Sequence, residues 1–235
     1  RLFKYDFDYD DPKWRNRNMR KAISLAIDSV GITEAFAGPF GSPGKSIMTS
    51  IHESYVPNDG YLEYDPQKAR RLLEAEGYQP GSGGILQKNG NPLVVSFGTS
   101  DVGFRKDIAE AMAAQLSAIG IKGVAKATER GAYWGELLKD DIPFDLFDTN
   151  WGSLMDEVGM LYGHYWGPTS SPEGLTMSRR SGDPIDSLIV KAVITIDHAE
   201  RMKTLKELQE VFYKDAVALV LYDARTGWAT LANVE

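Results

Sequence analysis

The chain has 235 residues, with 43% hydrophobic and 25% charged residues, and a formal net charge of −7. This composition is typical of a globular protein with one large domain or two small ones, and the negative charge argues against a nucleic-acid surface. Without cysteine, the chain cannot form disulfides, zinc–thiolate sites or a cysteine nucleophile, and it has no apolar run as long as the roughly 18 residues of a membrane span.

The N-terminal region predicts a strand followed by a helix. Residues 2–9 alternate apolar and polar side chains, which is typical of a half-buried strand. Apolar residues then recur at helical spacing from Met19 to Ile27. A basic cluster lies at the start of this helix, and its charge favours a solvated helix start: Arg15, Arg17, Arg20 and Lys21.

A P-loop is excluded at Gly44-Lys45-Ser46. Such a loop needs a glycine five residues before Gly44, and that position is Pro39. A turn rich in glycine and proline is predicted instead.

The next helix has sequence signals for both of its ends. Asp65 is a good N-cap, Pro66 fits the first helical position, and Gly77 provides the left-handed residue that ends the helix.

Strands and helices alternate through the rest of the chain, which predicts a layered α/β sheet. Residues 88–91 resemble a hairpin turn, and strands are predicted at 93–97, 121–127, 144–150 and 217–222, with one more at 226–231. Helices are predicted at about 101–120 and 133–138, after Asp183-Pro184, and after the acidic capping box of Asp197 and Glu200. Residues 155–182 show no regular pattern.

Three stretches in order resemble one protein family. They are the segment from Tyr64 to Tyr78, the segment from Asn18 to Asp28, and Phe144-Asp145 followed by Asn150-Trp151-Gly152. Together they resemble the solute-binding proteins of ABC importers, and within them the dipeptide, oligopeptide and nickel-binding type. The resemblance implies a three-layer α/β/α lobe of the class II periplasmic-binding-protein fold. It implies that residues 1–235 are a single lobe, the second (C-terminal) of two, with hinge-proximal strands at about 2–9 and 217–231.

The implied function is that of the substrate-binding component of an importer, in which this chain forms one wall of the ligand cleft. The implied partners are a small-molecule or peptide-like solute, the membrane permease and the first lobe of the same protein, with no cofactor. The implied location is periplasmic or at the cell surface. The signal segment is expected to lie outside this chain, because it opens on Arg1 without a basic and apolar leader. Two alternatives are an α/β enzyme of unknown reaction and a sensor domain built on the same lobe. Neither a Gly-x-Ser-x-Gly elbow nor a His-Glu-x-x-His motif supports an enzyme.

The candidate site follows the strand that ends at Asn150, because open α/β sheets bind ligands at their strand ends. Trp151 offers a large aromatic contact, and Gly152 allows a close approach of the backbone. Asp156 or His164 is expected to tune the site, although His164 can equally cap a turn and some of the aromatic residues can be core. The candidate ligand-binding residues are Asn150, Trp151, Gly152, Asp156, His164, Tyr165 and Trp166.

The chain departs from the family pattern at three positions. Leu154 stands where peptide-binding members carry the aspartate that pairs with a peptide ammonium. Met155 replaces a tyrosine of the nickel-binding members, and Thr169 stands at the spacing of their histidine. No metal-ligand set is therefore predicted. The expected ligand is held by aromatic contact and neutral hydrogen bonds.

Overall fold

The structure is a computed structural model and describes residues 1–149, 157–167 and 177–225. Its main sheet has six strands in the order β2-β9-β1-β8-β6-β7, and a small antiparallel sheet contains β3, β4 and β5. The strands of the main sheet are β1 (Leu2–Phe7), β2 (Gly41–Pro43), β6 (Val94–Ser100), β7 (Lys122–Thr128), β8 (Leu146–Asp148) and β9 (Ala218–Ala224). Those of the small sheet are β3 (Gln79–Pro80), β4 (Leu86–Lys88) and β5 (Asn91–Pro92).

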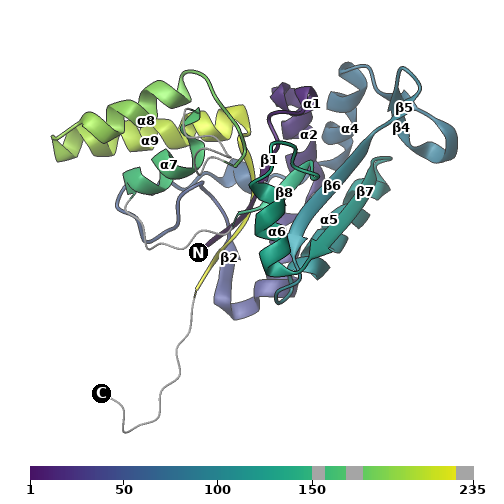
Figure 1. The fold of residues 1–235 in the computed structure, drawn as a ribbon, viewed down its shortest axis with the longest axis horizontal. Helices are drawn as coiled ribbons and strands as arrows, with labels where there is room; N and C mark the ends of the chain where they lie inside the picture. The colour runs from purple at the N-terminus through teal and green to yellow at the C-terminus, as the bar shows by residue number, and fades with distance from the viewer. Residues whose placement is uncertain (150–156, 168–176, 226–235) are drawn as a thin grey trace, which may run out of the picture.

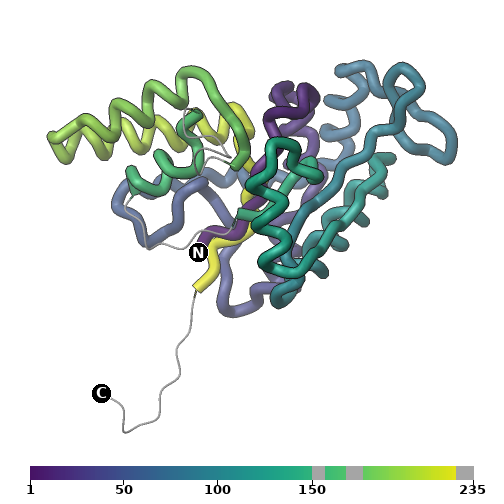
Figure 2. Tube along the Cα trace, in the orientation of Figure 1, coloured from purple at the N-terminus to yellow at the C-terminus, as the bar shows by residue number. Residues whose placement is uncertain are grey.

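Helices cover both faces of the main sheet, so the lobe has three layers, as expected (Figure 1). On one face lie α1 (Pro12–Arg15), α2 (Arg17–Ala26), α3 (Ser29–Ile32), α4 (Pro66–Ala75) and α5 (Arg105–Ala118). On the other lie α6 (Arg130–Leu137), α7 (Glu157–Tyr165), α8 (Ile185–Ile194) and α9 (His198–Asp215). Figure 2 follows the same path as a tube, with α7, α8 and α9 grouped on the left.

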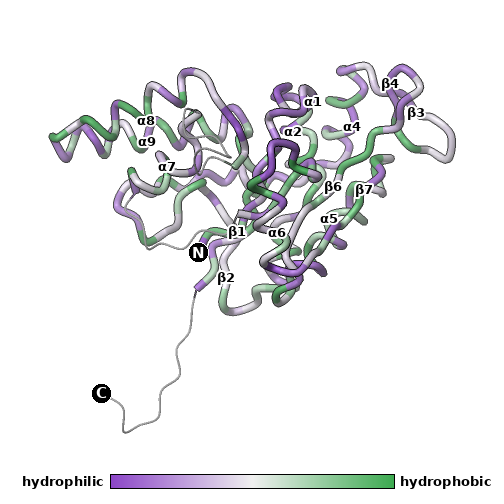
Figure 3. The backbone as a smooth tube through the Cα atoms, in the orientation of Figure 1, coloured by the Kyte–Doolittle hydropathy of each residue, from purple (hydrophilic) through white to green (hydrophobic). Residues whose placement is uncertain are grey.

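The two faces have separate apolar cores. Phe3, Tyr5 and Phe7 of β1 pack with α2, α4 and α5, whereas Leu2 packs with α7, α8 and α9. Apolar and hydrophilic segments alternate along α8 and α9 in Figure 3, which is typical of helices with one face on a core. No helix in the described part of the chain is long and apolar enough to cross a membrane.

The prediction that β1 is half-buried is wrong. All six of its residues are buried, because β1 lies in the middle of the sheet with helices on both faces. Lys4 is 5% exposed and Asp6 is 4% exposed, so two charges lie inside the lobe. A buried charge needs a partner of opposite charge and further hydrogen bonds. The groups that pair with Lys4 and Asp6 form part of the candidate site described below.

The structure confirms the helix ends for which the sequence predicted capping residues. Asp65 accepts a hydrogen bond from the Lys68 N–H at 2.8 Å, and Gly77 adopts a φ of 91° just beyond α4. Asp197 accepts one from the Glu200 N–H at 2.8 Å and begins α9. The hairpin turn between β4 and β5 is also confirmed. The strand predicted at 226–231 lies outside the described residues.

The prediction that residues 155–182 are irregular is wrong for the first part of this segment, because α7 occupies Glu157–Tyr165. Gly159 and Gly163 lower the helix propensity of this stretch. However, Met160, Leu161, His164 and Tyr165 recur at helical spacing, and all four are buried. Packing in the core with α8 and α9 therefore outweighs the local propensity.

Candidate functional site

Four strands of the main sheet end at one edge. β6 pairs in parallel with β7 and β8, and β1 pairs antiparallel with both β8 and β9. The carboxyl ends of β6, β7, β8 and β9 therefore meet where β1 begins, which is the lower edge in Figure 1. We call this the carboxyl edge. Ligands of open α/β sheets bind at such an edge, and β8 ends there, directly before the predicted site residues in the sequence.

The predicted site residues fall into two groups. Asn150, Trp151, Gly152 and Asp156 lie outside the described residues. His164 and Tyr165 lie in the last turn of α7, so the prediction that these two occupy a loop is wrong, whereas Trp166 directly follows the helix. His164 is 6% exposed and Tyr165 is 1% exposed, while Trp166 is half-buried. The Trp166 ring stacks on the ring of Tyr162, with their centroids 4.5 Å apart.

Tyr165 belongs to a buried polar network that joins β1, the end of β8 and α7. Lys4 Nζ lies 2.5 Å from Asp6 Oδ2 and donates to Thr149 Oγ1 at 2.6 Å. The Thr149 hydroxyl donates to Asp6 Oδ2, and the Tyr165 hydroxyl donates to Asp6 Oδ1 at 2.9 Å. Thr149 is the last described residue before the predicted loop. The network therefore fixes the position from which that loop departs.

The Lys4 ammonium interacts favourably with the Asp6 carboxylate and with the Tyr165 ring. Burial lowers the pKa of Lys4, and the nearby carboxylate of Asp6 opposes that shift. The Lys4 ammonium also lies 5.0 Å from the centroid of the Tyr165 ring, within the range of a cation–π contact. The sequence offers one signal for this group, the opposite charges of Lys4 and Asp6 at alternate positions of β1, but a half-buried strand places such residues on its solvent-facing side.

A second ion pair lies at the same edge. Arg105, the first residue of α5, has Nη1 2.7 Å from Oδ2 of Asp148, whose side chain is fully buried. Burial raises the pKa of Asp148, and Arg105 opposes the shift. The Tyr133 hydroxyl donates to the Asp148 carbonyl at 2.8 Å. The ion pair holds the start of α5, and the Tyr133 hydroxyl holds α6, against the end of β8; sequence spacing gives no signal for either contact.

Apolar side chains stand exposed at the carboxyl edge. Val102 and Phe104, between β6 and α5, are 46% and 63% exposed, and Phe40 is 62% exposed. The Phe36 and Phe104 ring centroids lie 6.3 Å apart. Exposed aromatic groups at a strand-end edge provide rigid area for the apolar part of a ligand or for a facing domain.

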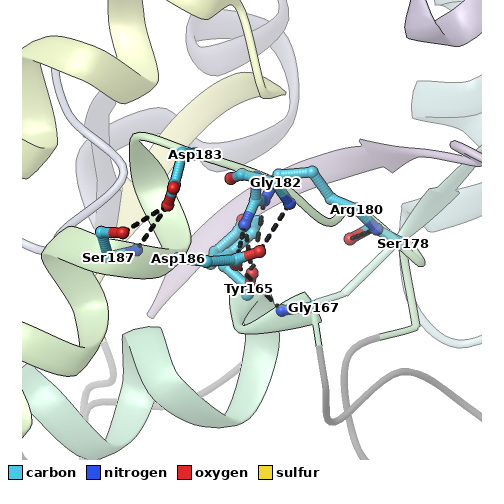
Figure 4. Close-up of polar contacts among 8 residues, drawn as sticks. All are labelled: Tyr165, Gly167, Ser178, Arg180, Gly182, Asp183, Asp186 and Ser187. Carbon is cyan, nitrogen blue, oxygen red and sulfur yellow. Dashed lines mark hydrogen bonds and ion pairs between the residues drawn. The ribbon is translucent and has the colours of Figure 1, made fainter.

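Arg180 holds the C-terminal end of α7 in place (Figure 4). It is 4% exposed, and its Nε and Nη2 donate to the Tyr165 carbonyl at 3.3 and 2.9 Å. Its Nη1 donates to the Gly182 carbonyl at 3.0 Å, and Nη2 pairs with Asp186. Asp186 in turn accepts from the Gly167 N–H at 3.0 Å. We call Arg180 and Asp186 the α7 clamp.

A hollow of about 720 Å³ lies beside the first turn of α7. Its lining combines apolar residues of α7, α8 and α9 with five polar ones: His52, Glu53, Glu157, His198 and Arg201. Across the described ranges, no group of three or more histidine or acidic residues is placed to hold a metal ion.

Burial of His164 predicts that the protein loses stability in acid. Its pKa falls from 6.5 to about 3, first because of burial and second because of the Lys4 charge. Between these values the unfolded chain binds a proton that the folded protein does not, so stability falls as pH drops below 6.5. From pH 7 to pH 5 the loss attributable to His164 is about 2 kcal/mol.

Urea unfolding of the wild type and of His164→Gln at pH 7 and pH 5 checks this expectation. The variant lacks the titrating ring. Between pH 7 and pH 5 it is therefore expected to lose about 2 kcal/mol less stability than the wild type. His52 and His198 are present in both proteins and cancel in the comparison. Equal pH dependence of the two proteins contradicts the prediction.

The chain is 25% identical over 220 residues to the glutathione-binding protein GsiB of Salmonella paratyphi A, which covers 88% of this chain and 38% of that protein. GsiB of Escherichia coli K12 is 24% identical over 216 residues, with the same coverage. The chain thus spans well under half the length of the curated relatives that it matches.

Solved structures share the fold. The oligopeptide-binding protein AppA of Bacillus subtilis, in complex with a nonapeptide, matches with a TM-score of 0.84 and 21% identity, covering 94% of this chain and 44% of that one. NikZ of Campylobacter jejuni, in complex with Ni(L-His), matches with a TM-score of 0.81 and 20% identity, covering 95% and 45%. DppA of Helicobacter pylori, in complex with the peptide STSA, matches with a TM-score of 0.80 and 22% identity, covering 94% and 41%.

The family model described as bacterial extracellular solute-binding proteins, family 5 Middle, matches residues 1–173. This match includes the three sequence stretches noted above, the strand β8 and α7. It covers well over half of the chain. The chain therefore belongs to the bacterial extracellular solute-binding proteins of family 5.

Proposed function

We propose that this chain forms one wall of the ligand cleft in the substrate-binding component of an ABC importer. The family match over residues 1–173 is the observation that carries the proposal. Such proteins close two lobes around a ligand by a hinge motion. The chain covers 38% of its curated relatives, which leaves room for a second lobe to supply the other wall. The role is binding rather than catalysis, in keeping with the names of these relatives.

In this proposal residues 1–235 form a single lobe, and the strands at about 2–9 and 217–231 lie nearest the hinge. Two backbone hydrogen bonds support that placement. The Arg1 amino group donates to the Ala224 carbonyl at 2.7 Å, and the Ala224 N–H donates to the Arg1 carbonyl at 2.6 Å. The start of β1 and the end of β9 thus lie side by side at the carboxyl edge. In the proposed hinge motion, these paired strands stay together and the lobe moves as one rigid body.

The ligand class that we propose is a peptide-like solute, delivered to a membrane permease from outside the cytoplasm. GsiB is named for glutathione, and the AppA and DppA structures contain peptides. The exposed aromatic groups at the carboxyl edge suit the side chains of such a ligand. Leu154 replaces the acidic residue that selects an ammonium. We therefore expect recognition through aromatic contact and neutral hydrogen bonds.

Native mass spectrometry of the full-length protein, purified without refolding, tests the ligand class. A bound peptide-like mass, displaced by glutathione or by an unlabelled tetrapeptide in calorimetry, supports the proposal. Retention of a nickel chelate assigns a different ligand. Turnover of any bound compound during incubation rejects a binding-only role and favours the enzyme alternative.

Trp151→Ala in the full-length protein is expected to weaken solute binding by about 1–3 kcal/mol, because an aromatic anchor loses its contact area. The fold is expected to remain intact, which circular dichroism and thermal unfolding check. Unfolding of the variant places Trp151 in the core. Unchanged affinity in a folded variant places the site on another loop.

A further inference from the structure

A basic dish lies at the edge of the sheet opposite the carboxyl edge. It has a volume of about 560 Å³, and its lining includes Tyr9, Arg15, Arg17, Arg20, Arg180 and Lys214. β1 ends at Phe7, just before these residues, so the dish is remote from the strand ends of the candidate site. Several of its lining residues come from α1, α2 and the C-terminal end of α9, and Figure 1 shows α1 and α2 at the upper edge.

Two buried guanidinium groups give the dish a rigid floor. Arg20 is 1% exposed and donates to the carbonyls of Trp14, Asp215 and Ala216 at 2.6, 2.6 and 3.1 Å. Its Cζ lies 4.8 Å from the centroid of the Tyr9 ring. Arg180, the basic residue of the α7 clamp, is the second. Both side chains are held by existing hydrogen bonds, so their charges are fixed in place before any ligand arrives.

Arg15 and Arg17, at the rim, each donate a hydrogen bond from Nε and keep their Nη donors for other acceptors. Nε of Arg15 donates to the Tyr9 carbonyl at 2.8 Å, and Nε of Arg17 donates to the Lys214 carbonyl. Within the described residues, neither arginine lies within 4.0 Å of a carboxylate. Their Nε contacts hold the guanidinium groups at the rim, while the Nη groups remain available for an external acceptor.

The balance of charge favours an anion. Five basic side chains line the dish against two carboxylates, those of Asp183 and Asp215. Asp215 Oδ2 is 2.9 Å from Arg20 Nη2, and Asp183 accepts hydrogen bonds from the N–H and hydroxyl of Ser187. Lys214 lies 3.3 Å from Glu210 in an exposed pair, which is weak. On a chain with a net charge of −7, this is a local positive field.

We propose that the basic dish binds a phosphate group, supplied either by free inorganic phosphate or by the headgroup of an anionic phospholipid. Two planar guanidinium groups with free Nη donors match the geometry of phosphate oxygens, which accept paired hydrogen bonds. Asp215 and Asp186 pair with the two floor guanidinium groups, so the positive charge offered to a ligand comes from Arg15 and Arg17, above a floor that needs no rearrangement. The site is separate from the proposed solute cleft and takes a different class of ligand.

The test is the double variant Arg15→Gln/Arg17→Gln in the full-length protein, with Arg70→Gln/Arg71→Gln on the exposed surface of α4 as its control. Both remove two positive charges, so a general effect of net charge is equal in the two. Calorimetry at low salt with inorganic phosphate forms one arm. Cosedimentation with vesicles of phosphatidylglycerol and phosphatidylcholine forms the other. The dish variant is expected to bind about tenfold or more weakly than wild type, and the control to bind as wild type does.

The two arms separate the sources. Binding of phosphate in solution without vesicle binding assigns a free anion, and the reverse assigns a headgroup. The proposal is overturned if the wild type binds neither probe, or if the control variant loses as much affinity as the dish variant. Lys214→Gln, which leaves both Nε contacts in place, provides a second variant if the double variant unfolds. Solute affinity is expected to be unchanged in all three, which keeps this test independent of the proposed function.

Discussion

Arg180→Met is expected to destabilise the protein by about 3–5 kcal/mol, because it removes one partner of a buried ion pair. Arg180 is 4% exposed and also satisfies the carbonyls of Tyr165 and Gly182. Methionine provides similar length without a donor. The last turn of α7 then loses its clamp, and the carboxylate of Asp186 loses its charged partner. Urea unfolding with tryptophan fluorescence measures the change.

A control variant and a repair variant sharpen this expectation. Arg71→Met removes an exposed arginine of α4 whose side chain is 65% exposed, so its effect is expected to stay within about 0.5 kcal/mol. Arg180→Met/Asp186→Asn removes the unpaired charge, and is expected to recover part of the lost stability. Equal stability of Arg180→Met and Arg71→Met contradicts the role of the clamp.

Elements with local signals were predicted well from the sequence. The helix α4 carries its own cap at Asp65 and its own stop at Gly77, and α9 carries its cap at Asp197. Caps and turns are decided by residues within three or four positions of each other. A pattern of that kind is visible in one sequence, without knowledge of what packs against it.

Elements that depend on distant packing were predicted poorly. The helix α7 contains Gly159 and Gly163, and it is stabilised by burial against α8 and α9 rather than by propensity. The strand β1 alternates polar and apolar residues as an exposed-edge strand does, yet it lies at the centre of the sheet. Its position is set by pairing with β9, more than 200 residues away along the chain. No local pattern contains that information.

The candidate site shows the same division. The end of β8 was predicted to begin the site, and the structure places Thr149 at the carboxyl edge. The partners that fix this point could not be predicted, because Lys4 and Thr149 are 145 residues apart and Asp6 and Tyr165 are 159 residues apart. Sequence reasoning locates the edge, whereas the fold determines which buried charges support it.

Lys4→Met is expected to destabilise the protein by about 3–5 kcal/mol, because Asp6 is left as an uncompensated charge inside the lobe. Lys4 is 5% exposed, and its ammonium is the basic partner of Asp6 at 2.5 Å. The hydroxyls of Thr149 and Tyr165 still donate to that carboxylate, but hydroxyl donors do not balance its charge. Equilibrium unfolding at pH 7 measures the loss.

Lys4→Met/Asp6→Asn separates charge from packing. Asparagine keeps an oxygen that accepts from the Tyr165 hydroxyl and carries no charge, so the double variant is expected to be more stable than Lys4→Met alone. Lys122→Met, at an exposed position of β7, is the matched control, and its effect is expected to be within about 0.5 kcal/mol. Because Thr149 precedes the predicted binding loop, Lys4→Met is also expected to weaken solute binding in the full-length protein, and Asp6→Asn in the double variant to restore it partly. A Lys4→Met protein as stable as the Lys122→Met control shows that the buried pair does not hold this edge together.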